Sequence, residues 1–131
     1  MAFMSLSAQQ LAAQKNISWV LAEKIAQKIL TGEYPPGSTF KIVTGTAALN
    51  EHKVTPQETI FDSGVYWLVP KHNADGEALG SINFSQALAY SDNVYFYEMG
   101  HRVGIDKLGD YAKLFGLGEK TGIDLPYEAS G

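Results

Sequence analysis

The chain has 131 residues, of which 45% are hydrophobic, so its length suits one domain or less and its composition disfavours disorder. The net charge of −4 and the absence of a basic stripe give no support for nucleic-acid binding. The chain has no cysteine, which excludes disulfides, thiolate metal sites and a cysteine nucleophile. Because no apolar run approaches the roughly 20 residues of a membrane span and no signal peptide is recognisable, we expect a soluble globular piece.

The N-terminal segment, residues 1–32, is expected to be helical over 5–30, with a break near Asn16 left open. Its second half is the clearer part, and Ser18 is a candidate cap for it. Apolar residues recur there at helical spacing, at Ala22, Ile25, Ala26 and Ile29.

The stretch "YPPGSTFKIV" belongs to the next segment, residues 33–53, and predicts a helix over 38–50 after an extended Pro-Pro approach. Ser38 and Lys41 are three residues apart, so on a helix they share one face and the amine can reach the hydroxyl. Burial would lower the pKa of the lysine and make it a base, which would activate the serine for acyl transfer. The competing interpretation is a helix start at which Ser38 is only a cap.

Residues 54–83 are punctuated by Pro and Gly into short pieces such as "TIFD" and "VYWLV", and predict loops with one or two short hairpin strands. The Asp75-Gly76 pair suits a tight turn. Tyr66 and Trp67 are interpreted as a small packed cluster, with a position at the mouth of a cleft as the alternative.

Three helices are expected in residues 84–116, over about 83–90, 92–103 and 106–115, and the last would be capped by Asp106. Residues 117–131 are a turn-rich tail. The predicted fold class is therefore mainly α, with short irregular β hairpins. A single face of the middle helix is predicted to join the core, through Tyr95, Phe96, Met99 and Val103.

The run Ser91-Asp92-Asn93 stands at the start of the middle helix. A serine there could relay a proton, and the Asn93 amide could both donate to and accept from a substrate amide. A capping serine with polar neighbours is the plainer interpretation. Ser81-Ile82-Asn83 has the same S-x-N spacing but no aromatic run behind it.

Taken together, S-x-x-K and S-D-N are two of the three motifs of penicillin-binding proteins and β-lactamases. From about residue 31 to 131 the chain resembles class B penicillin-binding proteins of the elongation type, through "GEYPPGSTFKIVTGTAAL", "INFSQALAYSDNVYFYEMGHRVGIDKL" and "FGLGEKTGIDLPYEASG". The resemblance implies a peptidoglycan D,D-transpeptidase with Ser38 as acylated nucleophile, Lys41 as general base, Ser91 as relay and Asn93 as substrate-orienting amide. It implies no chemical role for Asp92.

The same resemblance implies stem peptides as substrates, β-lactam antibiotics as covalent inhibitors, no cofactor, and a parent enzyme anchored in the cell membrane with its catalytic part outside the cytoplasm. The third motif, K-T-G, lies on an active-site strand in the family. Lys120-Thr121-Gly122 spells it here, but no strand pattern follows. We therefore interpret 1–131 as a single partial domain, the helical subdomain without the main β-sheet subdomain, inactive or weakly active alone.

Two other hypotheses stay open. The chain could be a non-catalytic helical interaction module that self-associates through the face the sheet would cover. It could also be a small serine hydrolase that uses Lys120. The histidines, His52, His72 and His101, match no metal-binding spacing and are expected to be surface or structural residues.

Overall fold

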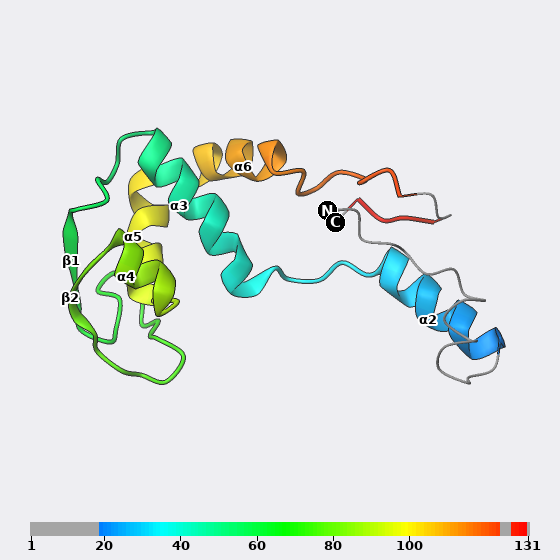
Figure 1. Ribbon diagram of the computed structural model, residues 1–131, viewed down its shortest axis with the longest axis horizontal. Coiled ribbons are helices and arrows are strands. Elements are labelled where there is room, and N and C mark those ends of the chain that lie inside the picture. The colour runs from blue at the N-terminus through cyan, green and yellow to red at the C-terminus, as the bar shows by residue number, and fades with distance from the viewer. Residues whose placement is uncertain (1–18, 124–126, 131) are drawn as a thin grey trace. The chain divides into compact units, whose positions relative to one another are not determined.

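The computed structural model describes residues 19–123 and 127–130, so the predicted break near Asn16 and the Ser18 cap lie outside the described residues (Figure 1). The chain divides into two compact units, residues 1–35 with 116–131, and residues 36–115. None of the helices in the described ranges is both long and apolar enough to cross a membrane.

The first unit contains the helix α2 (Trp19–Thr31), which agrees with the helix predicted for this region. Just after it, the Tyr34 hydroxyl donates to the carbonyl of Lys28. In the C-terminal part of the unit, the backbone N–H and hydroxyl of Thr121 donate to Glu128, both at 2.6 Å. Lys120 and Thr121 lie in neither a helix nor a strand, as expected for loop residues.

The second unit begins with a 3-10 turn, η1 (Gly37–Thr39), which leads directly into α3 (Phe40–Asn50). The predicted helix over 38–50 is therefore present, but its first turn is tighter. Pro36 has helical φ and ψ and cannot donate a backbone hydrogen bond, which suits a helix start. Ser38 lies inside this first turn, one residue past its beginning.

A short hairpin follows, in which β1 (Thr59–Asp62) pairs antiparallel with β2 (Gly80–Asn83). Ile60 lies opposite Ile82, and Ile82 is buried. The prediction of a strand at "TIFD" is thus confirmed, whereas that at "VYWLV" is wrong. In that stretch Val65 forms an isolated bridge with His72. The chain then turns back on itself, because the N–H of Tyr66 donates to the carbonyl of Lys71 at 2.7 Å.

Three helices complete the unit, as predicted: α4 (Phe84–Ala89), α5 (Asn93–Val103) and α6 (Ile105–Leu114). Asn83 begins α4 with a capping box that it shares with Gln86. Asp92 caps α5. The prediction of Asp106 as a cap is wrong, because α6 follows Gly104 (φ 85°) without a side-chain cap, and Asp106 lies in its first turn.

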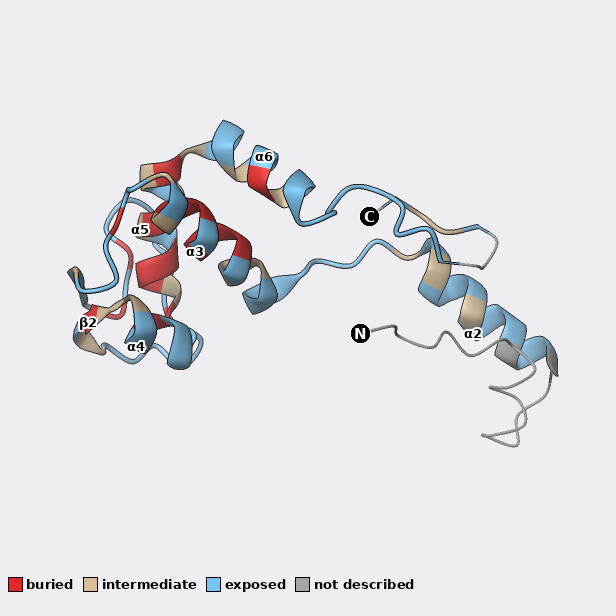
Figure 2. Cartoon of the chain, turned by 45° about the horizontal axis from the view of Figure 1, so that its top comes forward, coloured by how far each residue is buried: buried red, intermediate tan, exposed pale blue. Residues whose placement is uncertain are grey.

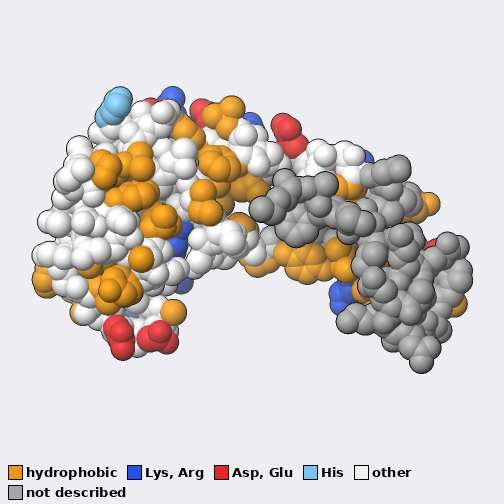
Figure 3. Space-filling model, in the orientation of Figure 1, with side chains coloured by type: hydrophobic (Ala, Val, Ile, Leu, Met, Phe, Trp, Pro, Cys, Tyr) orange, Lys and Arg blue, Asp and Glu red, His pale blue; other side chains and the backbone are white. Residues whose placement is uncertain are grey.

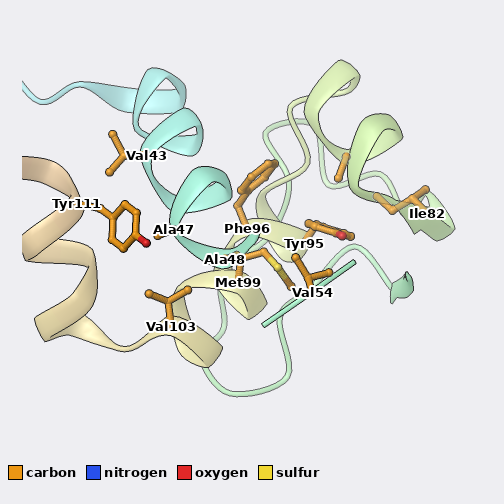
Figure 4. Close-up of a cluster of buried hydrophobic side chains, with 11 residues drawn as sticks. Val43, Ala47, Ala48, Val54, Ile82, Tyr95, Phe96, Met99, Val103 and Tyr111 are labelled. Carbon is orange, nitrogen blue, oxygen red and sulfur yellow. The ribbon is translucent and has the colours of Figure 1, made fainter. Parts of the chain in front are cut away.

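The core of this unit lies where α3 and α5 pack against each other, and both helices show their buried residues on the facing sides (Figure 2). The predicted core face of α5 is confirmed, since Tyr95, Phe96, Met99 and Val103 are all buried. Figure 4 shows Ala47 and Ala48 of α3 beside the side chains from α5. Small residues on α3 thus allow the aromatic residues of α5 to approach its backbone.

Gly45 of α3 lies in this contact. A Cβ atom built on it would come within 2.8 Å of Cζ of Phe84 and 3.3 Å of Cε1 of Phe96. These rings pack edge to face, with centroids 6.1 Å apart. Glycine is therefore the residue that lets α3 lie against the aromatic cluster.

The architecture is mainly α, and the described residues contain one two-stranded sheet. Hydrophobic side chains also reach the surface, and Figure 3 shows them gathered over α3 and α6. Ile42, Ile105 and Leu114 are among the most exposed of them, at 56%, 80% and 79%.

Candidate active site

The two predicted motifs meet at the N-terminal end of α3. Ser38 and Lys41 come from η1 and α3, and Ser91 and Asn93 come from the turn between α4 and α5 and from the first residue of α5. Ser91 has φ 55°, a left-handed conformation that is uncommon for serine. That turn allows α4 to end and α5 to begin within three residues.

The amine of Lys41 is the centre of the arrangement. Its Nζ donates to the carbonyl of Ser91 at 2.5 Å, to the hydroxyl of Ser91 at 3.0 Å and to Oδ1 of Asn93 at 2.7 Å. An ammonium group has three hydrogens, so these three acceptors satisfy it fully. These contacts can hold a protonated lysine, which must lose a proton before it can act as a base.

The hydroxyl of Ser91 connects the lysine to Ser38. It donates to Oγ of Ser38 at 3.1 Å while it accepts from Lys41. The hydroxyl of Ser38 therefore meets another side chain across the site, and no side-chain cap is formed at the start of η1 or α3. This contact speaks against the interpretation of Ser38 as a helix cap.

Burial lowers the pKa of Lys41 below its ordinary value of 10.5, and the negative charge of Asp92 opposes that shift. The ring of Phe96, whose centroid lies 5.8 Å from Nζ, forms part of the apolar wall. A lowered pKa makes the neutral amine more accessible, which is what a general base requires.

Two hollows share Ser38 and Asn93 in their linings. The larger, of about 510 Å³, runs from Ser38 along Lys41 and Phe96 toward Leu108 and is mainly apolar. The smaller, of about 320 Å³, is lined by the Ser91 turn and the loop over residues 73–79. A substrate bonded at Ser38 would have access to both hollows, which suits a substrate longer than a single amino acid.

Sequence reasoning missed a layer of polar residues beneath the motif. Asp62 and Asp92 are 0% and 1% exposed, and both accept hydrogen bonds from Nδ2 of Asn73, at 2.9 and 3.1 Å. In return, Oδ1 of Asn73 accepts from the backbone N–H of Asn93 at 2.8 Å. The sequence signal was limited to Asp62 and Asn73, in a segment that otherwise predicted loops, and to Asp92 in the middle of the S-D-N run, and only the fold brings the three together.

The side chains of the remaining candidates take no part in this arrangement. All three histidines are exposed, and no group of three His, Asp or Glu side chains suited to a metal ion occurs among the residues the structure describes. Tyr66 is buried and packs against Trp67 and Tyr97, with ring centroids 5.9 and 5.8 Å away, while Trp67 itself is 74% exposed. This is the packed cluster that the sequence indicated.

Comparison with known proteins decides the family. Residues 4–131 match the family described as penicillin binding protein transpeptidase domain. The chain belongs to this family. The family inferred from "YPPGSTFKIV" and "SDN" is thereby confirmed.

Curated relatives and solved structures agree with this assignment. The chain is 36% identical over 115 residues to the peptidoglycan D,D-transpeptidase MrdA of Haemophilus influenzae. The aligned residues make up 84% of this chain and 18% of the relative. The chain is 40% identical over 107 residues to the stage V sporulation protein D of Bacillus subtilis, covering 75% and 16%.

Among solved structures, the chain is similar to Pseudomonas aeruginosa PBP2 in complex with WCK 5153, with a TM-score of 0.76 and 31% identity over 96% of this chain and 29% of that one. It is also similar to Mycobacterium tuberculosis PBP3 complexed with ampicillin, with a TM-score of 0.65 and 30% identity over 75% and 22%. The chain thus spans less than a third of each of these four proteins.

Proposed function

We propose that this chain forms part of the catalytic domain of a peptidoglycan D,D-transpeptidase, in which Ser38 is the nucleophile, Lys41 the general base, Ser91 the proton relay and Asn93 a substrate-orienting amide. The observation that carries the proposal is the continuous contact from the Lys41 amine through the Ser91 hydroxyl to the Ser38 hydroxyl. Family membership adds support, because relatives of the family are named as D,D-transpeptidases.

The proposed chemistry begins with neutral Lys41. As Oγ of Ser38 bonds to the substrate carbonyl carbon, its proton passes to Ser91, and the proton of Ser91 passes to the Lys41 amine. The bond from that carbon to the leaving nitrogen then breaks, and the protonated Lys41 passes its proton to Ser91 while Ser91 gives its own proton to the leaving amine. An acyl-serine remains, and an acceptor amine on a second stem peptide resolves it by the reverse steps, which restores Ser38.

Asn93 can serve the substrate as well as the lysine. Its Oδ1 accepts from Lys41, and its Nδ2 donates to the carbonyl of His72 at 3.1 Å. Both ends of the amide are thus fixed beside Ser38, where a substrate amide would lie. Once Lys41 is neutral it donates fewer hydrogen bonds, which frees an acceptor on Asn93 for substrate.

We also infer the setting of the parent protein from this function. Peptidoglycan stem peptides lie outside the cytoplasm, so the proposed enzyme works there, anchored to the cell membrane. β-Lactams, which mimic the acyl donor, are the proposed covalent inhibitors. The Mycobacterium tuberculosis relative complexed with ampicillin supports this part of the proposal.

The direct test is the intact mass of the chain after exposure to ampicillin. A covalent adduct that is lost in Ser38→Ala, and that forms far more slowly in Lys41→Ala, is the expected result. Ser63→Ala is a matched control, because Ser63 is also an exposed serine but contacts the carbonyl of Val65. An adduct that persists in Ser38→Ala would refute the assignment of the nucleophile.

A second test addresses the length of the chain, which spans 18% of the Haemophilus influenzae relative. Residues 36–115 would replace the matching segment of that relative, and the chimera would be labelled with a fluorescent penicillin. Labelling that depends on Ser38 is expected. A folded chimera that fails to label while the unmodified relative labels would contradict the proposal.

A second candidate function follows from the exposed apolar residues on α3 and α6, Ile42, Ile105 and Leu114. Such a surface could drive self-association, as expected of a helical interaction module. Sedimentation over increasing concentration tests it. A monomer at all concentrations would count against this module, and Ile105→Lys should reduce any association that does occur.

A further inference from the structure

The buried aspartates, Asp62 and Asp92, have no cationic partner among the groups they bond to in the described part of the chain. Asp62 accepts from the backbone N–H of Gly64 at 2.7 Å, the N–H of Leu79 at 2.8 Å and Nδ2 of Asn73 at 2.9 Å. Asp92 accepts from the N–H of Tyr95 at 2.5 Å and from Asn73 at 3.1 Å. Two buried carboxylates that accept from the same nitrogen atom, Nδ2 of Asn73, cannot both carry charge at low cost.

The difference in donors between the two aspartates decides where the charge lies. Asp62 receives three short hydrogen bonds, two of them from the backbone, whereas Asp92 receives one short bond and one longer one. Donors that point at a carboxylate stabilise its ionised form. The donors around Asp62 therefore favour its ionised form, whereas Asp92 keeps its proton and donates it in a hydrogen bond to Asp62.

Asn73 connects this acid pair to the motif above it. The N–H groups of Asn93 and Val94 point at its Oδ1, at 2.8 and 3.4 Å, which fixes the amide with Nδ2 toward the two carboxyls. Nδ2 also lies 2.9 Å from the carbonyl of Glu77, so its two hydrogens are shared among three acceptors. The orientation of Asn73 therefore depends on the acid pair accepting hydrogen bonds, and the start of α5 depends on Asn73.

We propose that Asp62 and Asp92 hold one proton between them, carried by Asp92, and that this pair acts through Asn73 as a positioning device for Ser91 and Asn93. The pair does not touch substrate. A neutral Asp92 also removes a negative charge from beside Lys41, so the proton on Asp92 favours the neutral amine that the base needs. The effect on the Lys41 base rests on the proposed function, whereas the shared proton does not.

The directions of the pKa shifts agree with this geometry. Burial raises the pKa of Asp92, opposed by the N–H of Tyr95 and reinforced by Asp62. Burial also pushes the pKa of Asp62 upward, but the hydrogen bonds from Leu79, Gly64, Asp92 and Asn73 together bring it below its ordinary value. Other charged or titratable groups facing the region are Lys41 on α3 and, around the smaller hollow and its loop, His72, Asp75, Glu77 and Tyr90.

Asp62 and Asp92 change the stability of the fold with pH in opposite directions. The stability that Asp62 contributes is lost as pH falls through its lowered pKa. The stability linked to the proton on Asp92 is present at low pH and is lost as pH rises from the ordinary value of 3.8 through its raised pKa. The joint contribution of the pair is thus largest near the ordinary carboxyl pKa.

Carboxyl-selective NMR of the 131-residue chain tests the shared proton directly. Asp92 is expected to titrate above the ordinary value and Asp62 below it, and the backbone amide signals of Ser91 and Asn93 should shift with the midpoint of Asp92. Titration of Asp92 at or below the ordinary value, or Ser91 and Asn93 signals that ignore it, would overturn the proposal. This readout is independent of acylation, so a chain that failed to acylate would refute the proposed function alone.

Two isosteric variants separate positioning from general stability. Asparagine in place of Asp92 still accepts from Tyr95 and donates to Asp62, and it loses only the 3.1 Å bond from Asn73, so Asp92→Asn should keep the fold and abolish the pH-dependent shift of the Asn93 signal. Asp62→Asn places an amide N–H group against the donors that now face Asp62, namely the N–H groups of Gly64 and Leu79 and Nδ2 of Asn73. The rate at which ampicillin acylates this variant should therefore fall by about 100-fold, the loss that a misplacement of about 1 Å can cause. The exposed Asp110 on α6 provides the control, Asp110→Asn, which should resemble the unmodified chain. Equal effects of Asp62→Asn and Asp92→Asn would contradict the assignment of the proton.

Discussion

Replacement of Gly45 by alanine tests whether the close approach of α3 to the aromatic cluster is required. Alanine is favoured over glycine within a helix by about 0.8–1.0 kcal/mol, so propensity alone predicts stabilisation. The new Cβ, however, would lie 2.8 Å from Cζ of Phe84 and 3.3 Å from Cε1 of Phe96. Phe84 cannot easily swing away, because its ring packs edge to face on both Tyr95 and Phe96, with centroids 6.2 and 6.1 Å away.

Overpacking of this kind costs about 1–3 kcal/mol. The difference between that cost and the gain in propensity is a net loss of up to about 2 kcal/mol in the free energy of unfolding. Gly109→Ala is the matched control, because Gly109 lies on α6 and a Cβ there would meet no atom within 4 Å. That variant should be stabilised by nearly the full gain in propensity.

Urea unfolding followed by circular dichroism measures both variants, and their difference isolates the strain because the propensity term cancels. Gly45→Ala is expected to unfold at a lower urea concentration than the unmodified chain, and Gly109→Ala at a higher one. If Gly45→Ala were as stable as Gly109→Ala, the packing argument for Gly45 would be refuted. The aromatic cluster would then be soft enough to accommodate a methyl group.

Three further predictions concern single side chains. Because burial lowers the pKa of Lys41, acylation should increase as pH rises through a midpoint below 10.5, and Lys41→Arg, which stays charged, should lose about 10²–10⁴-fold in rate at every pH. Burial raises the pKa of Tyr66 to about 12, so Tyr66 should still be protonated when pH reaches the ordinary tyrosine pKa of 10.0. The rise in phenolate absorbance up to that pH should therefore be the same in Tyr66→Phe as in the unmodified chain, and a smaller rise in the variant would contradict this. The hydroxyl of Tyr111 accepts from Asn50 and donates to Glu51 at 3.0 Å, so Tyr111→Phe should lower the free energy of unfolding by about 1 kcal/mol in urea titrations, and an unchanged value would show that these bonds are neutral.

The sequence by itself determined the helices, the core face of α5 and the four residues of the two motifs. These follow from local rules, because helical periodicity, turn residues and motif spacing are properties of neighbouring residues. Where such signals were weak the predictions failed. The stretch "VYWLV" has the composition of a strand, but the chain reverses between Tyr66 and Lys71, and Asp106 has the chemistry of a cap but lies in the first turn of α6.

The tertiary structure alone decided what connects the motifs. The distance between the hydroxyls of Ser38 and Ser91 is 3.1 Å although 53 residues separate them, and it depends on how α3 packs against α5. The burial of Asp62 and Asp92 likewise depends on residues from the hairpin, a loop and a helix start. Sequence spacing cannot reveal such contacts, because charge, burial and proton affinity are set by atoms that are distant along the chain and adjacent only in the fold.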